Sequence, residues 1–109
     1  MISNGSPDDR IEGMLLDHIQ TQKNAILALS HQYGVRRIRV FGSVARNEER
    51  ADSDVGFLVD LPRGYDLFTQ RLPLAEKLAE LVGRRVDLVL EHELSRHIRD
   101  DVLKEAVDL

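Results

Sequence analysis

Hydrophobic residues change their spacing along the chain, and the changes divide it into six expected elements. Apolar positions recur at helical spacing in three segments, residues 10–33, 68–82 and 94–106. β-branched and aromatic residues gather in three others, residues 35–41, 53–61 and 86–90, which predicts three strands. The expected order is helix, strand, strand, helix, strand, helix.

Four residues mark where the helices begin and end. Gly34 should close the first helix and Gly83 the second, because glycine readily adopts the left-handed conformation found at helix ends. Pro73 lies inside the second helical pattern, so this helix is expected to start or bend there. Asp66 precedes it and is expected to cap it.

The connections between the strands predict the fold class. The first two strands are joined without a full crossover helix, which favours antiparallel pairing, whereas the helix before the third strand permits a parallel crossover. We therefore expect an α+β fold in which helices back a small mixed sheet. Residues 1–9 have no periodicity and are interpreted as a flexible leader, and residues 10–109 as a single domain.

Composition narrows the class of protein. A chain of 109 residues with 42% apolar and 31% charged residues suits one soluble globular core. It has neither an apolar run of membrane-spanning length nor a secretory signal, so we expect a cytoplasmic protein without a membrane partner. The lack of cysteine excludes disulfides, thiolate nucleophiles and cysteine zinc sites.

Charge is distributed unevenly. The formal net charge of -4 argues against a protein that coats nucleic acid, and no direct nucleic-acid binding is expected. Five arginines are nevertheless close in sequence, namely Arg36, Arg37, Arg39, Arg46 and Arg50. They either form a local anion site or make a solvated face with Glu48 and Glu49 as partners.

The first candidate for chemistry is the Gly42-Ser43 turn that follows the first strand. Glycine lets the backbone approach a phosphate closely, and the turn's N–H groups and the serine hydroxyl can donate to phosphate oxygens. A short helical segment within residues 42–51 would add its positive end. Taken alone, a Gly-Ser pair after a strand is most often an ordinary turn.

Carboxylates follow at strand spacing. Magnesium takes oxygen ligands and commonly uses one or two protein carboxylates with phosphate oxygens and water. Aspartates at i and i+2 of a strand share a face, and one from a neighbouring strand completes a two-metal clamp. Asp54 and Asp87 suit two of these three places, whereas Gly56 occupies the third and offers no side-chain ligand.

The strings GSVAR, SDVGFLVD and RRVDLVL together resemble the minimal nucleotidyltransferase (MNT) family of the DNA polymerase β-like superfamily, whose pattern is GSxARG, then SDxDLxV, then a strand with a third aspartate. The resemblance covers nearly the whole domain. It implies that Gly42 and Ser43 hold the terminal phosphates of ATP and that Asp54 binds Mg²⁺. It also implies that Asp87 supports the metal or helps to deprotonate the attacking hydroxyl, and that Arg46 lies near phosphate or structures the turn.

Two positions depart from the family's pattern. Asn47 replaces a glycine, which is a mild change because asparagine tolerates left-handed conformations. Gly56 replaces the second metal-binding aspartate, and losing a bridging carboxylate should reduce activity by orders of magnitude. Asp52 and Asp60 lie too far along the strand to substitute for it.

The resemblance implies an antitoxin that transfers AMP from ATP to a partner HEPN-family RNase toxin, with which it forms a hetero-oligomer, in an activity impaired by Gly56. One alternative is a non-catalytic MNT fold that neutralises its toxin by binding. Glycine at position 56 is either natural or an introduced inactivating substitution. A weaker alternative is an aminoglycoside-type transferase, although such enzymes generally add a second domain.

Overall fold

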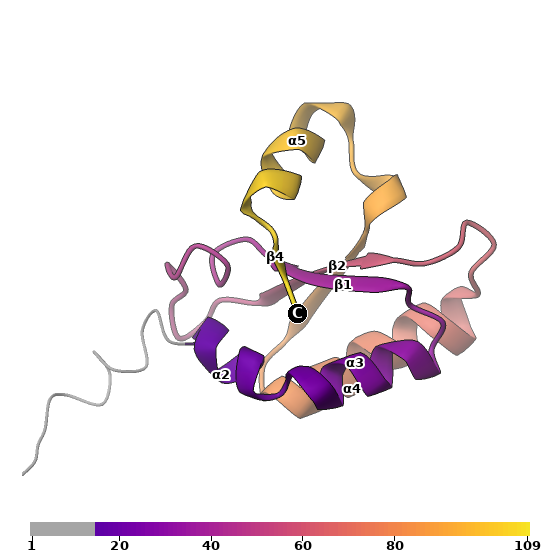
Figure 1. Ribbon diagram of the computed structural model, residues 1–109, viewed down its shortest axis with the longest axis horizontal. Helices are drawn as coiled ribbons and strands as arrows, with labels where there is room; N and C mark the ends of the chain where they lie inside the picture. The colour runs from indigo at the N-terminus through magenta and orange to yellow at the C-terminus, as the bar shows by residue number, and fades with distance from the viewer. Residues whose placement is uncertain (1–14) are drawn as a thin grey trace, which may run out of the picture.

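The computed structural model describes residues 15–109, which are built around a four-stranded mixed sheet with the strand order β3-β2-β1-β4 (Figure 1). The strands are β1 (Arg37–Phe41), β2 (Val55–Asp60), β3 (Val86–Leu90) and β4 (Val107–Asp108). β1 pairs antiparallel with β2 and with β4, whereas β2 pairs parallel with β3. The α+β class and both predicted pairings are confirmed, but β4 was not predicted.

Helices lie on both sides of this sheet. α2 (Leu15–Thr21), α3 (Lys23–Gln32) and α4 (Leu72–Val82) lie on one side, and α5 (Arg96–Glu105) stands on the other (Figure 1). A π-helical turn, η1 (Leu67–Arg71), leads into α4, and a 3₁₀ turn, η2 (Glu91–Glu93), follows β3. Within the described part of the chain, no helix is long and apolar enough to cross a bilayer.

The first predicted helix differs from the structure. Residues 10–14, like the predicted leader, lie outside the described residues, so the domain boundary at residue 10 stays a prediction. The remainder is two helices, because Gln22 leaves the helical conformation with φ -97° and ψ 10°. Its side-chain amide donates to the carbonyl of Leu81 over 2.8 Å. Ile19 on α2 and Ile26 on α3 are nevertheless both fully buried in the core.

Local signals around α4 behave as predicted. Asp66 accepts hydrogen bonds from the backbone N–H groups of Phe68 and Thr69, although the element it caps is η1. These bonds, that of Thr69 first, hold the pKa of Asp66 below its usual value because they favour the charged carboxylate. Pro73 lies in the first turn of α4, and Gly83 ends the helix with a φ of +73°.

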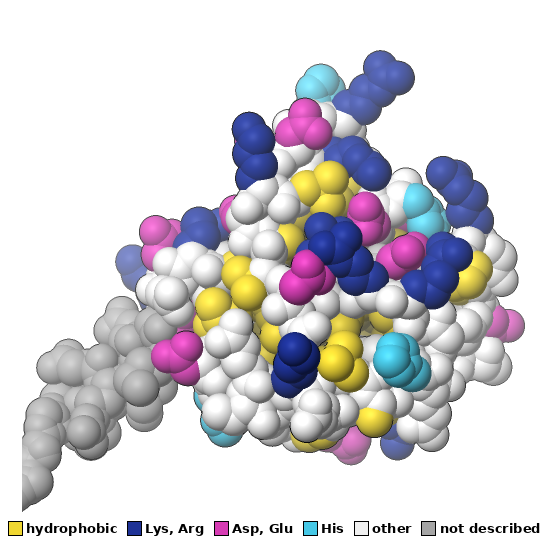
Figure 2. Space-filling view, viewed as in Figure 1, with side chains coloured by type: hydrophobic (Ala, Val, Ile, Leu, Met, Phe, Trp, Pro, Cys, Tyr) yellow, Lys and Arg dark blue, Asp and Glu magenta, His cyan; other side chains and the backbone are white. Residues whose placement is uncertain are grey.

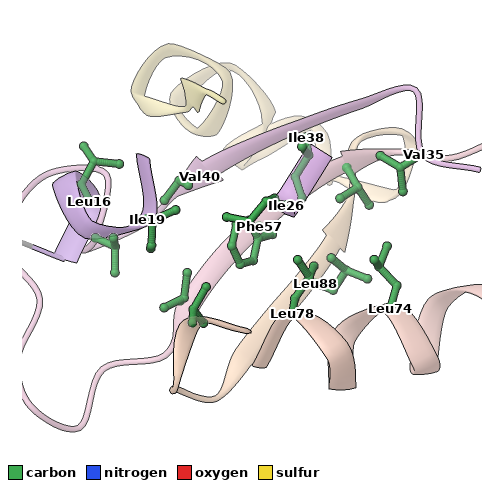
Figure 3. Packing of buried hydrophobic residues seen from close by; sticks show 14 of the residues in the cluster. Leu16, Ile19, Ile26, Val35, Ile38, Val40, Phe57, Leu74, Leu78 and Leu88 are labelled. Atoms are coloured by element: carbon green, nitrogen blue, oxygen red, sulfur yellow. The ribbon is translucent and has the colours of Figure 1, made fainter. Parts of the chain in front are cut away.

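The hydrophobic core lies between the sheet and the α2–α4 layer (Figure 3). Phe57 lies at its centre, and Leu74 and Leu78 of α4 are fully buried with it. By alternation along β2, Val55 and Val59 share this face with Phe57 and are also fully buried. Leu58 lies on the opposite face yet is only 1% exposed, so both faces of β2 are covered at this point.

Candidate functional site

The turn after β1 is built by glycine and asparagine. Gly42 has a φ of +81° and Asn47 a φ of +58°, as expected for a residue that tolerates the left-handed region. The N–H of Arg46 donates to the carbonyl of Gly42 over 3.2 Å, and that of Glu48 to the carbonyl of Ser43 over 2.8 Å. The segment is a turn, so the short helical segment expected here, with its positive end, does not form.

A carboxylate from the far end of the chain meets this turn. The backbone N–H of Gly42 donates to Oε2 of Glu105 over 2.6 Å, and Nη1 of Arg46 donates to Oε1 of the same residue over 2.9 Å. Arg46 also donates to Glu48, and hydrogen bonds to Glu48 and Glu105 raise the pKa of the guanidinium. Sequence reasoning missed Glu105, because nothing in the local pattern of α5 indicates a contact 63 positions away.

The other four arginines are dispersed. Three of them have different ion-pair partners, namely Arg36 with Asp60, Arg37 with Asp108, and Arg39 with Glu91. Figure 2 accordingly shows basic side chains interleaved with acidic ones on this face of the molecule. Only Arg46 among the five makes a described contact with the Gly42 turn, so the expected cluster is not one anion site.

The expected solvated face is also only partly correct. Glu48 does pair with Arg46, but Glu49 is 1% exposed and accepts a hydrogen bond from the N–H of Leu15. Arg50 uses its backbone N–H to bind the hydroxyl of Ser53. Glu49 is therefore a buried residue that helps to hold the start of α2.

The sheet brings the candidate residues to one end. Phe41, the last residue of β1, pairs with Gly56, and Gly56 pairs with Asp87 on β3. Asp54 lies two positions before Gly56 and on the same side of the strand by alternation. The Gly42 turn, Asp54, position 56 and Asp87 therefore meet at the same end of three adjacent strands.

Both candidate carboxylates are accessible. The side chain of Asp54 is half exposed and pairs with Arg85, with 3.1 Å between Nε and Oδ1. Asp87 is exposed on β3. The partner of Asp54 is itself largely exposed, so this ion pair is weak and leaves the carboxylate available to another cation.

Gly56 is closely covered. A Cβ atom at this position would lie 3.0 Å from Cε1 and Cζ of the Phe41 ring and 3.0 Å from the Phe41 carbonyl oxygen. The ring can rotate, but the carbonyl belongs to the paired strand and moves only with β1. A side chain at position 56 therefore requires small shifts of the Phe41 ring and carbonyl.

The donor set limits the metal that the site can hold. No group of three or more histidine or acidic side chains suited to a metal ion occurs among residues 15–109. Asp54 and Asp87 provide two carboxylates at one sheet end, which fits a single Mg²⁺ whose other ligands are phosphate oxygens and water. A two-metal clamp would need the third carboxylate that Gly56 lacks.

Comparison with known proteins defines the class. The family model described as "nucleotidyltransferase domain" matches residues 23–109, and the chain belongs to this family. Among its relatives is protein adenylyltransferase MntA of Thermococcus cleftensis. The two are 44% identical over 79 residues, which cover 72% of this chain and 79% of the relative.

Solved structures agree with this class. One assigned to the minimal nucleotidyltransferases has a TM-score of 0.76 and 41% identity, and the match covers 86% of this chain and 95% of that one. A toxin–antitoxin complex with AMP-PNP has a TM-score of 0.67 and 26% identity over 79% of this chain and 70% of that one. A third structure contains a tri-AMPylated HEPN toxin of Shewanella oneidensis in complex with an MNT antitoxin. It has a TM-score of 0.61 and 25% identity, and the match covers 82% of this chain and 69% of that one.

Proposed function

We propose that this chain is an MNT-type antitoxin, acting in the cytoplasm, that binds ATP with Mg²⁺ and transfers AMP to a hydroxyl of a partner HEPN toxin. The observation that carries the proposal is the meeting of the Gly42 turn, Asp54 and Asp87 at one end of the sheet. The names of its relatives support the reaction and the partner, since they include a protein adenylyltransferase and an MNT antitoxin with an AMPylated HEPN toxin.

The proposed roles follow from the chemistry of each group. Gly42 and Ser43 bind the terminal phosphates through N–H and hydroxyl donors, and Arg46 adds positive charge beside them. Asp54 and Asp87 would hold Mg²⁺, which when bound neutralises phosphate charge. The acceptor oxygen attacks the α-phosphorus, the bond to the β-phosphate oxygen breaks, pyrophosphate leaves, and the hydroxyl proton passes to Asp87.

Gly56 should make this transfer slow. Charge neutralisation and positioning supply most of the rate in such reactions, and glycine provides neither. The absence of a carboxylate at position 56 favours a second candidate function, in which the domain neutralises its toxin by contact alone. Both candidate functions include a hetero-oligomer with the toxin. They differ in whether AMP is transferred to it.

A transfer assay separates the two candidates. Labelled ATP, Mg²⁺ and a HEPN partner are incubated with the chain, with Gly56→Asp, and with Gly56→Asp combined with Asp54→Asn; Gly56→Asp combined with Asp52→Asn serves as the matched control. We expect transfer to rise by orders of magnitude in Gly56→Asp and in the control, and to be lost with Asp54→Asn. An aminoglycoside in place of the partner tests the small-molecule alternative.

The outcomes are distinct. Transfer by no variant, together with a tight complex, would favour neutralisation by binding. Strong transfer by the unaltered chain would contradict the role given to position 56. Equal loss of transfer from Asp52→Asn and Asp54→Asn would show that the reaction depends on the negative charge of this segment and not on metal binding by Asp54.

A further inference from the structure

Glu105 occupies the donors that the proposed function assigns to ATP. Its two carboxylate oxygens accept from the Gly42 N–H over 2.6 Å and from Nη1 of Arg46 over 2.9 Å. The side chain is 24% exposed, so this is a well-covered contact at the end of α5. We propose that Glu105 is a built-in competitor for the nucleotide's phosphates, and that it must leave the Gly42 turn before ATP binds.

The chemistry of the contact supports competition. A carboxylate and a phosphate present the same kind of acceptor, a negatively charged oxygen, and both bind arginine and backbone N–H groups through charge-assisted hydrogen bonds. One N–H cannot donate at full strength to both anions, and the two negative charges repel each other. The donors are therefore not free for phosphate while Glu105 stays in place.

The helix that carries Glu105 is suited to moving. α5 buries none of its residues, and Ile98 on it is 50% exposed. Its start is held by Arg99, which donates to the Glu91 carbonyl over 3.1 Å, and at its end Glu105 supplies the contacts with the turn. Segments with little buried apolar surface open at low free-energy cost.

The strand that follows α5 stays attached when Glu105 leaves. β4 pairs with β1, Asp108 is bound by two nitrogens of Arg37, and the N–H of Leu109 donates to the Ile38 carbonyl. Arg46 retains Glu48 as a second partner. Release therefore breaks the two contacts of Glu105 without unpairing the sheet, as a displaceable inhibitor requires.

Binding of AMP-PNP with Mg²⁺ to the whole chain, measured by calorimetry, tests this inference, which rests on the proposed function. Glu105→Gln removes the charge with little change in size, and Asp100→Asn removes a charge from an exposed residue of the same helix. We expect Glu105→Gln to bind at least about fivefold more tightly, because a neutral amide oxygen holds the Gly42 N–H and Arg46 less strongly than a carboxylate does and is displaced more easily by phosphate. Asp100→Asn should bind like the unaltered chain.

Hydrogen exchange on the unaltered chain provides a second test that needs no substitution. Bound AMP-PNP should accelerate exchange of the α5 amides, residues 96–105, while β2 keeps its protection. Unchanged or slower exchange in α5, or equal affinities for AMP-PNP in all three proteins, would overturn the competition but leave nucleotide binding intact. No binding by any of the three proteins would overturn the proposed function itself.

Discussion

The face of the sheet that packs against α2–α4 and the face that α5 partly covers have different kinds of contact. On the first, side chains such as Phe57, Val40 and Leu78 are fully buried in one continuous apolar cluster. On the second, charged side chains pair individually, and α5 buries none of its residues. The first face stabilises the domain, so the second is free to keep exposed carboxylates and a helix that buries none of its residues.

The division of the sheet into an apolar face and a charged face explains how a small domain can carry a site made of charged residues. A buried charge is costly unless it is paired, so acidic ligands are most easily kept where the sheet is incompletely covered. Asp54 and Asp87 remain accessible beside a fully apolar layer. Changes on the two faces should therefore separate stability from activity.

The largest expected effect comes from the packed face. Phe57→Ala removes a fully buried ring and should lower the free energy of unfolding by about 3–5 kcal/mol. Asp87→Asn on the opposite face should leave the urea denaturation midpoint close to that of the unaltered chain while abolishing transfer in the Gly56→Asp background. A large loss of stability from Asp87→Asn would contradict the division between the faces.

A smaller effect on stability is expected at Gly56, which lies in β2 on the face opposite to Phe57. In an open strand position, Gly→Ala should stabilise by about 0.5–1 kcal/mol. Because the new Cβ would lie 3.0 Å from the Phe41 carbonyl and ring, we expect Gly56→Ala to destabilise instead, by about 1 kcal/mol in urea denaturation. Phe41→Leu should recover part of the loss, and stabilisation by Gly56→Ala alone would show that the ring yields freely.

The smallest effect concerns the charged face and depends on pH. The hydrogen bond from Arg37 lowers the pKa of Asp108, so the ionised pair stabilises the fold above the unfolded pKa of about 3.9 and this contribution is lost as pH falls through the lower folded value. Asp108→Asn should lower the melting temperature slightly at pH 7, and the difference should vanish under acid. Asp101→Asn, an exposed change on α5, should produce no such pH-dependent difference.

Much of the fold was predictable because its signals are local. The β-branched and aromatic residues predicted β1, β2 and β3, and Asp66 and Gly83 predicted where helical structure begins and ends. The break at Gln22 was not predicted, because the apolar spacing of α2 and α3 continues across it. At the break, the Gln22 side chain contacts Leu81, which is far away in sequence, and no local pattern indicates such a contact.

The candidate site was predictable only in part, for the same reason. Gly42, Asp54 and Asp87 stood out through turn chemistry and strand position, and the pairing of β1, β2 and β3 brings their segments together. Their roles remain predictions. The contact of Glu105 with the turn and the pairing of β4 with β1 join residues far apart in sequence. A strand of two residues is also too short to show an alternating pattern.

The two-residue strand β4 also affects how the domain avoids associating with itself. It covers Arg39 and Val40 on the outer edge of β1, an edge that would otherwise present unpaired N–H and C=O groups to other chains. Before β4 docks, arginines at 37 and 39 keep this edge charged, which disfavours pairing with another strand. The short strand and these charges together protect the edge against aggregation, first during folding and then in the folded protein.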